Sequence, residues 1–307
     1  MKLLQHRIAQ SRLSLPVTAL YALLVWIASG LLAGQWWLQL GCFAVTLYLM
    51  ILLNNVNALI RVFSRMVGCS FLVLSCCACF LFPSVRGAVV SVCIAAAWLA
   101  LSQTYQDKQS AGMTYYAFLL VALASLAYVQ VLFFVPLLWL LMLTQLLSLS
   151  WRTWFASLIG LATPYWFALC WLFYSHDFTM VQTHIAALTD FRYPIDYSVL
   201  TMAEKAVYGF VVALTVLSIL HILYDSRNDK IRIRLLYGFM IWVDIVALAA
   251  IALQPHHYDM LMRIAIVCTA PLVGHFLALT TSRLSNILSM VIVATAVALT
   301  AFSLWAR

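Results

Sequence analysis

The sequence predicts an all-α membrane protein, a polytopic bundle of transmembrane helices. Hydrophobic residues make up 66% of its 307 residues and charged residues only 8%, whereas soluble domains carry about 25% charged residues. Apolar runs of about twenty residues recur along the whole chain, and a helix of that length crosses the hydrocarbon core at ~1.5 Å per residue. We therefore predict a single integral membrane domain over residues 1–307, with no separate soluble domain.

The apolar runs predict about eleven spans. The first run follows the basic segment "MKLLQHRIAQSR" and is longer than the core of a secretory signal, so we expect an uncleaved helix. Residues 115–151 are too long for one crossing, and "FFVP" predicts a turn at Pro136 with a short span after it. In chain order, the expected spans are residues 15–34, 37–58, 66–83, 87–104, 115–134, 136–151, 154–175, 205–224, 233–253, 260–280 and 285–305.

The lysines and arginines indicate how this bundle is oriented. If the N-terminus is cytoplasmic, twelve of the seventeen Lys and Arg residues fall on the cytoplasmic side and five on the outside. The positive-inside rule then favours an N-terminus in, C-terminus out arrangement with an odd number of spans. Because the basic residues are scattered singly between apolar runs, the net charge of +8 reflects topology, and we expect no nucleic-acid partner.

One sizeable loop, residues 176–204, is external in this arrangement. Its segment "FTMVQTHIAAL" suits a short amphipathic helix on the membrane surface. Its segment "DFRYPIDY" mixes aromatic rings with an arginine and two acids, a mixture that suits sugars and equally suits an aromatic belt at the membrane interface. The candidate substrate-binding residues of this loop are His184, Arg192 and Asp196.

A second polar stretch, "QPHHYDMLMRIA", lies on the same side and supplies His256, His257, Asp259 and Arg263. Asp259 and Arg263 are four residues apart on one helix face, so an ion pair at the membrane rim explains them. Alternatively, Arg263, His256 and the helix N-terminus form an anion site, and we keep all four residues as substrate-binding candidates. A metal site would need a third ligand, such as Asp259 or His184, and we predict none.

Cysteine spacing points to no metal site either. The chain has eight cysteines, and "CCAC" at residues 76–79 falls within a predicted helix with no second cluster opposite it. We interpret the cysteines as small packing residues. Because the chain also lacks the sequence motifs of nucleotide-binding, metalloprotease, serine hydrolase and haem sites, we expect no cofactor.

Asp244 is the most informative single residue. It lies in "FMIWVDIVALAAIAL", about nine residues and so roughly 13 Å from the outer end of its span. A charged acid at such a depth costs about 2.5–3.5 kcal/mol on insertion scales, so the side chain should face a cavity, a partner or another helix. The two interpretations are a proton or substrate site, with Asp244 as the catalytic acceptor, and a protonated acid that bonds a neighbouring helix. His275, in "PLVGHFLAL", is a second intramembrane titratable residue.

The middle of the chain resembles a known family. The segments that show the resemblance are "YQDKQS", "LASLAYVQVLFFVPLL" and "SWRTWFASLIGLATPYW", with "PLVGHFLAL" as a looser match. They resemble a family of multi-pass inner-membrane proteins of Gram-negative bacteria that is known only as a domain of unknown function. The resemblance covers about a third of the chain, and it implies a bacterial inner-membrane location without implying an activity.

A broader likeness is to membrane glycosyltransferases and ligases that use polyprenyl-linked sugars. One large group of these enzymes keeps a catalytic acid in the first external loop, which here is "GQWWLQL" and contains no acid. The ligase-type group uses basic residues and histidine in a later external loop, and Arg192 and His184 are residues of those types in the 176–204 loop.

Three functional hypotheses follow from the sequence. The first is a cell-envelope biogenesis protein that handles a lipid-linked or anionic glycan at the outer leaflet, with membrane lipids and a polyprenyl-linked glycan as partners. The second is a non-enzymatic subunit whose apolar helices dock a membrane protein partner. The third is a proton-coupled transporter with Asp244 and His275 as its relay, although the chain shows no inverted repeat and few Gly or Pro breaks in its spans.

Overall fold

The computed structural model of the protein describes residue 9 and residues 11–175, 179–190, 195–225, 228–280 and 283–306. Within these ranges the chain forms 13 α-helices joined by short 3-10 turns, and no strand is present. The α-helices are α2 (Ser14–Ala28), α3 (Leu31–Gly34), α4 (Trp37–Asn57), α5 (Met66–Cys77), α6 (Val85–Ser102), α7 (Ala111–Ala127), α8 (Phe134–Thr144), α9 (Trp151–Ser175), α10 (Thr179–Leu188), α11 (Met202–Asp225), α12 (Ile231–Leu253), α13 (Tyr258–Leu279) and α14 (Arg283–Trp305).

The all-α membrane prediction is confirmed at the level of helices. In the part of the chain that is described, seven helices are long and apolar enough to cross a membrane. The other predicted spans coincide with four shorter apolar helical stretches, which begin at Ser14, Met66, Ala111 and Val129. The protein is therefore a multi-pass membrane protein, whereas the full count of eleven crossings stays a prediction.

Two of the shorter stretches end where the backbone leaves the helical region. The predicted span 15–34 is interrupted at Gly30, whose φ of 98° lies in the left-handed region that favours glycine. The predicted span 66–83 breaks after Cys77, and a 3-10 turn from Cys79 to Leu81 follows it. The "CCAC" segment therefore straddles a helix end, and its three cysteines are buried as packing residues.

The predicted turn at Pro136 is wrong. The chain leaves helix α7 at Tyr128, where φ is −150° and ψ is 98°, and continues through a 3-10 turn from Val129 to Phe133 into α8. Pro136 lies in the first turn of α8, where the missing N–H of proline removes no intrahelical hydrogen bond. The short second span predicted after "FFVP" corresponds to α8.

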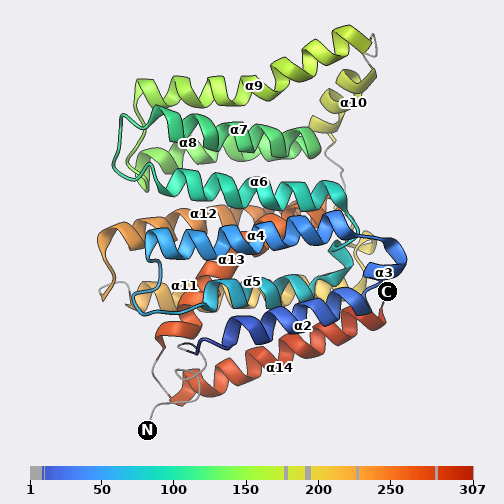
Figure 1. The fold of residues 1–307 in the computed structure, drawn as a ribbon, viewed down its shortest axis with the longest axis vertical. Helices are drawn as coiled ribbons and strands as arrows, with labels where there is room; N and C mark the ends of the chain where they lie inside the picture. Colours follow the sequence, from blue (N-terminus) through green and yellow to red (C-terminus); the bar gives the residue numbers. More distant parts are fainter. Residues whose placement is uncertain are drawn as a thin grey trace.

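Most helices run back and forth between two ends of the molecule, as Figure 1 shows. Helices α7, α8 and α9 form one side of the bundle, and α2 and α14 form the opposite side. Helix α13 runs through the centre, where it packs against α5, α6, α11 and α12. Most of its residues are buried inside the protein, including Thr269 and His275, so the polar groups along its middle lie within the bundle.

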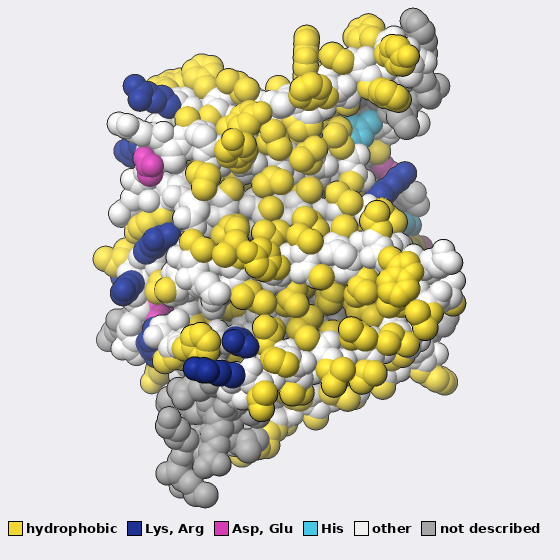
Figure 2. Space-filling model, in the orientation of Figure 1, with side chains coloured by type: hydrophobic (Ala, Val, Ile, Leu, Met, Phe, Trp, Pro, Cys, Tyr) yellow, Lys and Arg dark blue, Asp and Glu magenta, His cyan; other side chains and the backbone are white. Residues whose placement is uncertain are grey.

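Charge and hydrophobicity are segregated on the molecular surface. Hydrophobic side chains cover the middle of the face shown in Figure 2, and the lysines and arginines gather towards one edge of it. We call this edge the basic end, because the connections and helix ends there carry most of the described basic residues: Arg12, Arg61, Arg65, Lys108, Arg152, Lys230, Arg232 and Arg234. We call the opposite edge, which carries α10 and the start of α13, the loop end. The gathering of basic residues at one end of the bundle matches the positive-inside pattern.

The predicted short helix in the 176–204 loop is confirmed as α10, and its place on the membrane surface stays a prediction. It is joined to the bundle by a hydrogen bond from the side-chain amide of Gln130 to the Ala187 carbonyl (2.8 Å). A second hydrogen bond ties the loop to the end of α12, since the Tyr197 hydroxyl donates to the Ala252 carbonyl (2.7 Å), and His257 Nε2 lies 3.3 Å from the Asp190 carbonyl of the loop. These contacts place α10 and the residues before α13 at the same end of the bundle.

Candidate functional site along helix α13

Three layers of buried polar groups follow α13 from the loop end to the basic end. The first contains Arg263, the second contains Thr269 and the third contains His275. Successive layers are six residues apart, so about 9 Å separates them along the helix axis. Their partners come from α11, α12 and the connections at the two ends, so one helix carries polar contacts through most of the bundle.

The middle layer is built around Asp244 of α12. Its side chain is 0% exposed, and its Oδ2 accepts hydrogen bonds from the hydroxyls of Thr269 (2.8 Å) and Thr215 (2.9 Å). Its Oδ1 is buried without a hydrogen-bond partner. Because an unpaired buried oxygen is costly and uncommon in folded proteins, this atom is free for a proton or a water molecule. The structure thus agrees with parts of both interpretations of Asp244: Oδ2 bonds two neighbouring helices, and Oδ1 has no partner and can take up a proton.

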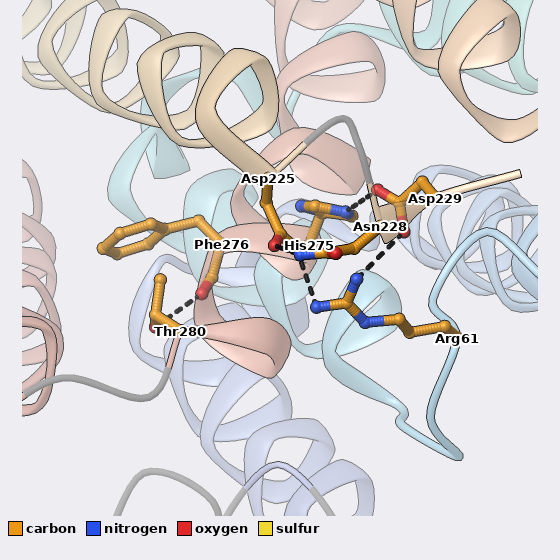
Figure 3. A network of polar contacts seen from close by, with 7 residues as sticks. All are labelled: Arg61, Asp225, Asn228, Asp229, His275, Phe276 and Thr280. Atoms are coloured by element: carbon orange, nitrogen blue, oxygen red, sulfur yellow. Dashed lines mark hydrogen bonds and ion pairs between the residues drawn. The ribbon is translucent and has the colours of Figure 1, made fainter. Parts of the chain in front are cut away.

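The layer at the basic end is a cluster of charged side chains, which we call the Asp229 cluster (Arg61, Asp225, Asn228, Asp229 and His275). Asp229 accepts a hydrogen bond from His275 Nε2 (3.0 Å) on Oδ2, and its Oδ1 lies 3.6 Å from Arg61 Nη1. Arg61 also pairs with Asp225 (2.7 Å), which accepts a further bond from Asn228 (2.6 Å). Figure 3 shows the Arg61 guanidinium extending to both carboxylates, with His275 on the far side of Asp229.

Burial makes the Asp229 cluster unusual. The side chains of Asp229 and His275 are 1% and 0% exposed, and His275 Nδ1 is buried without a hydrogen-bond partner. The imidazole of His275 packs against the rings of Tyr237 and His221, with centroid distances of 4.8 and 5.4 Å. A histidine in this setting has one nitrogen committed to a carboxylate and one nitrogen open, the arrangement that a proton relay requires.

The carboxylates and imidazole of the cluster also have the spacing of a metal-ligand set. Ligand atoms of Asp225, Asp229 and His275 lie within 4.8 Å of one another. Arg61 supplies a positive charge to both carboxylates in the same place, so the protein itself offsets one of the two negative charges. Sequence inspection missed this group because Asp229 and His275 are 46 residues apart and only the fold brings them together.

A hydrogen-bonded network extends the basic end towards α4 and α6. The side-chain amide of Asn57 donates to Ser102 Oγ (2.8 Å), and Asn57 Oδ1 accepts from Arg232 Nη2 (2.9 Å). Arg232 also lies over the ring of Tyr105, 5.7 Å from its centroid. Asn57 of α4 therefore joins helices α6 and α12 through its side chain.

At the loop end, Arg263 points into the bundle. Its Nε lies 3.3 Å from Asp259 Oδ1, which confirms the predicted pair four residues apart, and its Nη2 donates to the Leu81 carbonyl. The arginine side chain is only 10% exposed and packs against Gly87. It lines a cavity of about 40 Å³, which has room for water or a small ion, whereas pockets for organic ligands measure ~300–1,000 Å³.

The remaining candidates of the loop end have separate local partners. His184 Nε2 lies 3.4 Å from the Tyr165 hydroxyl, and partial burial lowers the pKa of this histidine. Asp196 accepts a hydrogen bond from the Ser198 N–H (2.8 Å), and hydrogen bonding by the Ser198 side chain, followed by this backbone bond, holds the carboxyl pKa below its ordinary value.

The two histidines before α13 lie in the 3-10 turn from Pro255 to His257. His257 Nε2 lies 3.3 Å from the Asp190 carbonyl, and its ring is 5.6 Å from that of Tyr128. His256 is half-buried in the same turn. Arg192 lies outside the described residues. Neither histidine lines the small cavity at Arg263, and neither do His184 and Asp196.

No protein-family model, curated protein or solved structure significantly matches this chain. The resemblances noted in the sequence therefore stay predictions, and the geometry alone supports the functional proposal.

Proposed function

We propose that this membrane protein is a proton-coupled transporter in which Asp244 and His275 exchange protons. The observation that carries the proposal is that two buried titratable groups contact one central helix, and each keeps an unpaired polar atom. Ionisable residues inside a membrane are costly, and in pumps and transporters they mark proton and substrate pathways. An acid and a histidine at different depths along α13 fit that pattern.

Asp244 connects protonation to helix packing. The two threonines that bond its Oδ2 belong to α11 and α13, while Asp244 itself belongs to α12. The carboxylate form accepts both hydroxyl hydrogen bonds, and the acid form places an additional O–H at the open Oδ1. Gain or loss of the proton therefore changes the contacts that hold three helices together, which is what coupling to a conformational change requires.

Helix α13 has a place to bend between the two groups. Pro271 lies inside the helix, between Thr269 and His275. Proline lacks the N–H that would bond the carbonyl four residues earlier, and most sharp bends in helices occur at such positions. The ~9 Å between the two layers exceeds one hydrogen bond, so proton passage requires water or a movement of α13.

The direct test is infrared spectroscopy of the reconstituted protein during a change of pH. We expect a protonated carboxyl band that disappears as the pH rises and is missing in Asp244→Asn, while the exposed-loop variant Asp107→Asn keeps it. A wild-type spectrum without any band that depends on Asp244 between pH 5 and 9 would rule out proton exchange there.

A flux measurement tests the transport half of the proposal. Liposomes that contain a pH-sensitive dye are given a potassium diffusion potential, and the rate of internal acidification is recorded. We expect Asp244→Asn and His275→Ala each to lower the protein-dependent rate at least tenfold, with Asp107→Asn unchanged. Equal rates in all four proteins would contradict the relay.

Handling of a lipid-linked or anionic glycan at the outer leaflet is a second candidate. Its support is the buried guanidinium of Arg263 in a cavity that hydroxyl groups and aromatic rings line. With a volume of about 40 Å³ the cavity admits an anionic group but not a sugar ring without opening. Loss of a co-purifying glycolipid in Arg263→Ala, measured by mass spectrometry, would favour this function over proton transport.

The proposal places the protein in a bacterial inner membrane with the basic end in the cytoplasm. The positive-inside bias supports this orientation. In a background without the native cysteines, Asp190→Cys and Lys230→Cys should react with a membrane-impermeant thiol reagent from opposite sides of the membrane. Labelling of both positions from one side would contradict the orientation and the odd number of crossings.

A further inference from the structure

A large apolar cavity lies between the two outer helices α2 and α14 and the centre of the bundle. Its volume is about 640 Å³, which is within the ~300–1,000 Å³ range of ligand pockets. Its walls come from α2, α5, α11, α13 and α14. Two residues on its rim, Val17 and Val293, are 63% and 54% exposed, so the cavity opens sideways to the bilayer between α2 and α14.

The cavity has the length of a lipid chain. Along α5 its lining runs from Met66, at the basic end, to Leu74, a rise of about 12 Å. One leaflet of a ~30 Å hydrocarbon core is about 15 Å thick. Beyond the cavity, in the half towards the loop end, α2 and α14 are joined by a hydrogen bond from Tyr21 to Thr300 (2.7 Å). The cavity thus spans the leaflet at the basic end.

A single polar atom faces this apolar space without a partner. Ser70 lines the cavity and is 4% exposed, and its hydroxyl makes no hydrogen bond with the protein. Buried hydroxyls are nearly always bonded, so the Ser70 hydroxyl is available to donate to an acceptor inside the cavity. Ser70 lies one helical turn from Met66, and that depth is suited to the ester groups of a membrane lipid.

Two arginines stand at the mouth of the cavity. Arg65 donates to the Arg12 carbonyl (3.1 Å), and Arg12 lies between the lining residues Ser11 and Leu13. Neither arginine has a carboxylate partner among the described residues. Guanidinium groups are favoured partners of phosphate, and basic side chains beside a membrane attract anionic lipids.

We infer that this cavity binds one anionic phospholipid taken from the leaflet at the basic end. Its phosphate lies at Arg65 and Arg12, an ester carbonyl accepts from the Ser70 hydroxyl, and an acyl chain fills the space past Val73 and Leu214. This site is separate from the proposed proton pathway, because none of Asp244, Thr269 and His275 lines the cavity.

Native mass spectrometry of the full chain in mild detergent tests this site. The protein is incubated with phosphatidylglycerol or with phosphatidylcholine of the same acyl chains. We expect about tenfold greater retention of phosphatidylglycerol by the wild type and loss of that preference in Arg65→Ala. The matched control is Arg152→Ala, which removes an arginine at the same end, away from the cavity, and should keep the preference.

Variants of residues that line the cavity distinguish binding of the lipid's acyl chain from binding of its headgroup. Val17→Trp at the exposed rim should block entry and abolish retention of both lipids, whereas Leu140→Trp, an exposed position on α8 away from the cavity, should leave it intact. Ser70→Ala should lower phosphatidylglycerol retention a few-fold. Equal retention of both lipids by the wild type, or unchanged retention in Val17→Trp, would overturn the inference. Preference for a long-chain isoprenyl phosphate over phosphatidylglycerol would overturn its assignment to a phospholipid.

Discussion

The two ends of the bundle hold their polar residues in different ways. At the loop end, the ion pair of Arg263 and the cap of α11 join side chains that are close in the sequence: Asp259 pairs with Arg263, and Thr201 and Glu204 cap the start of α11 through reciprocal hydrogen bonds. At the basic end, Arg61 pairs with Asp225 across 164 positions. Local pairs follow from the start of a helix, whereas the long-range contacts exist only if several helices are packed correctly.

This difference sets apart the end that the proposed transport function uses. Local capping contacts would form in any helix with the same sequence. A buried charge cluster is costly to assemble and is weak evidence for stability, so its assembly from distant segments points to a specific role. The first prediction tests whether the Asp229 cluster is in fact a tightly coupled unit.

Asp229→Ala should have the largest effect on stability. It leaves the buried His275 Nε2 without its acceptor and removes one of the two carboxylates near Arg61. Breaking a buried charged pair costs about 3 kcal/mol, which thermal unfolding in detergent would report. Glu204→Ala at the loop end is the comparison, and it should cost no more than about 1 kcal/mol because Glu204 only caps the start of α11 through exposed hydrogen bonds. Similar losses in the two variants would remove the distinction between the ends.

Gly274→Ala should have the next largest effect. A Cβ at this position would lie 2.9 Å from the backbone nitrogen of Val67, so α13 and α5 would have to separate. Overpacking of this kind costs about 1–3 kcal/mol. Gly209→Ala on α11 is the control, since no atom lies within 4 Å of its added Cβ. If unfolding measurements find Gly274→Ala as stable as Gly209→Ala, the close approach of α13 to α5 is incorrect.

Asn57→Ala should cost about 1–2 kcal/mol, because Ser102 and Arg232 each lose a hydrogen-bond partner inside the network of the basic end. Asn228→Ala is the control, because its bond to Asp225 is exposed. The two variants can be compared by chemical unfolding in the same detergent. A smaller loss for Asn57→Ala than for Asn228→Ala would show that the network is not a unit.

Composition and periodicity were sufficient to predict the helices, because the membrane requires long apolar segments whatever their partners are. They were insufficient where two apolar helices meet without a polar break, as at Tyr128, because an apolar turn inside the bundle leaves no compositional signal. Pro136 was misleading because proline is as compatible with the first turn of a helix as with a break.

The candidate site was predictable only in its individual residues. Asp244 stood out because a single acid in an apolar run is costly, and Arg263 with Asp259 stood out because of their spacing. The partners of Asp244 are threonines on two other helices, and those of His275 are a loop acid and a tyrosine. Threonine is common in membrane helices, so neither its role here nor the pairing of distant segments can be read from one sequence.

The smallest expected effect is a response of the loop end to pH. Burial lowers the pKa of His184 below its ordinary value of about 6.5, so the folded state favours the neutral imidazole. The stability that this histidine contributes is present above pH 6.5 and is lost as the pH falls towards the folded pKa. Because His184 joins α10 to Tyr165 of α9, acidification should loosen α10.

Hydrogen exchange of the α10 backbone amides at pH 7.5 and pH 5.5 would measure this loosening, after correction for the intrinsic effect of pH on exchange. His184→Phe keeps an aromatic ring beside Tyr165 but cannot gain a proton, so its corrected exchange should be independent of pH. His257→Phe serves as a second comparison, since His257 contacts the residue Asp190 just beyond α10. If His257→Phe rather than His184→Phe removes the pH dependence, the contact between the two external segments, and not the contact of α10 with α9, controls how the loop end responds to acid.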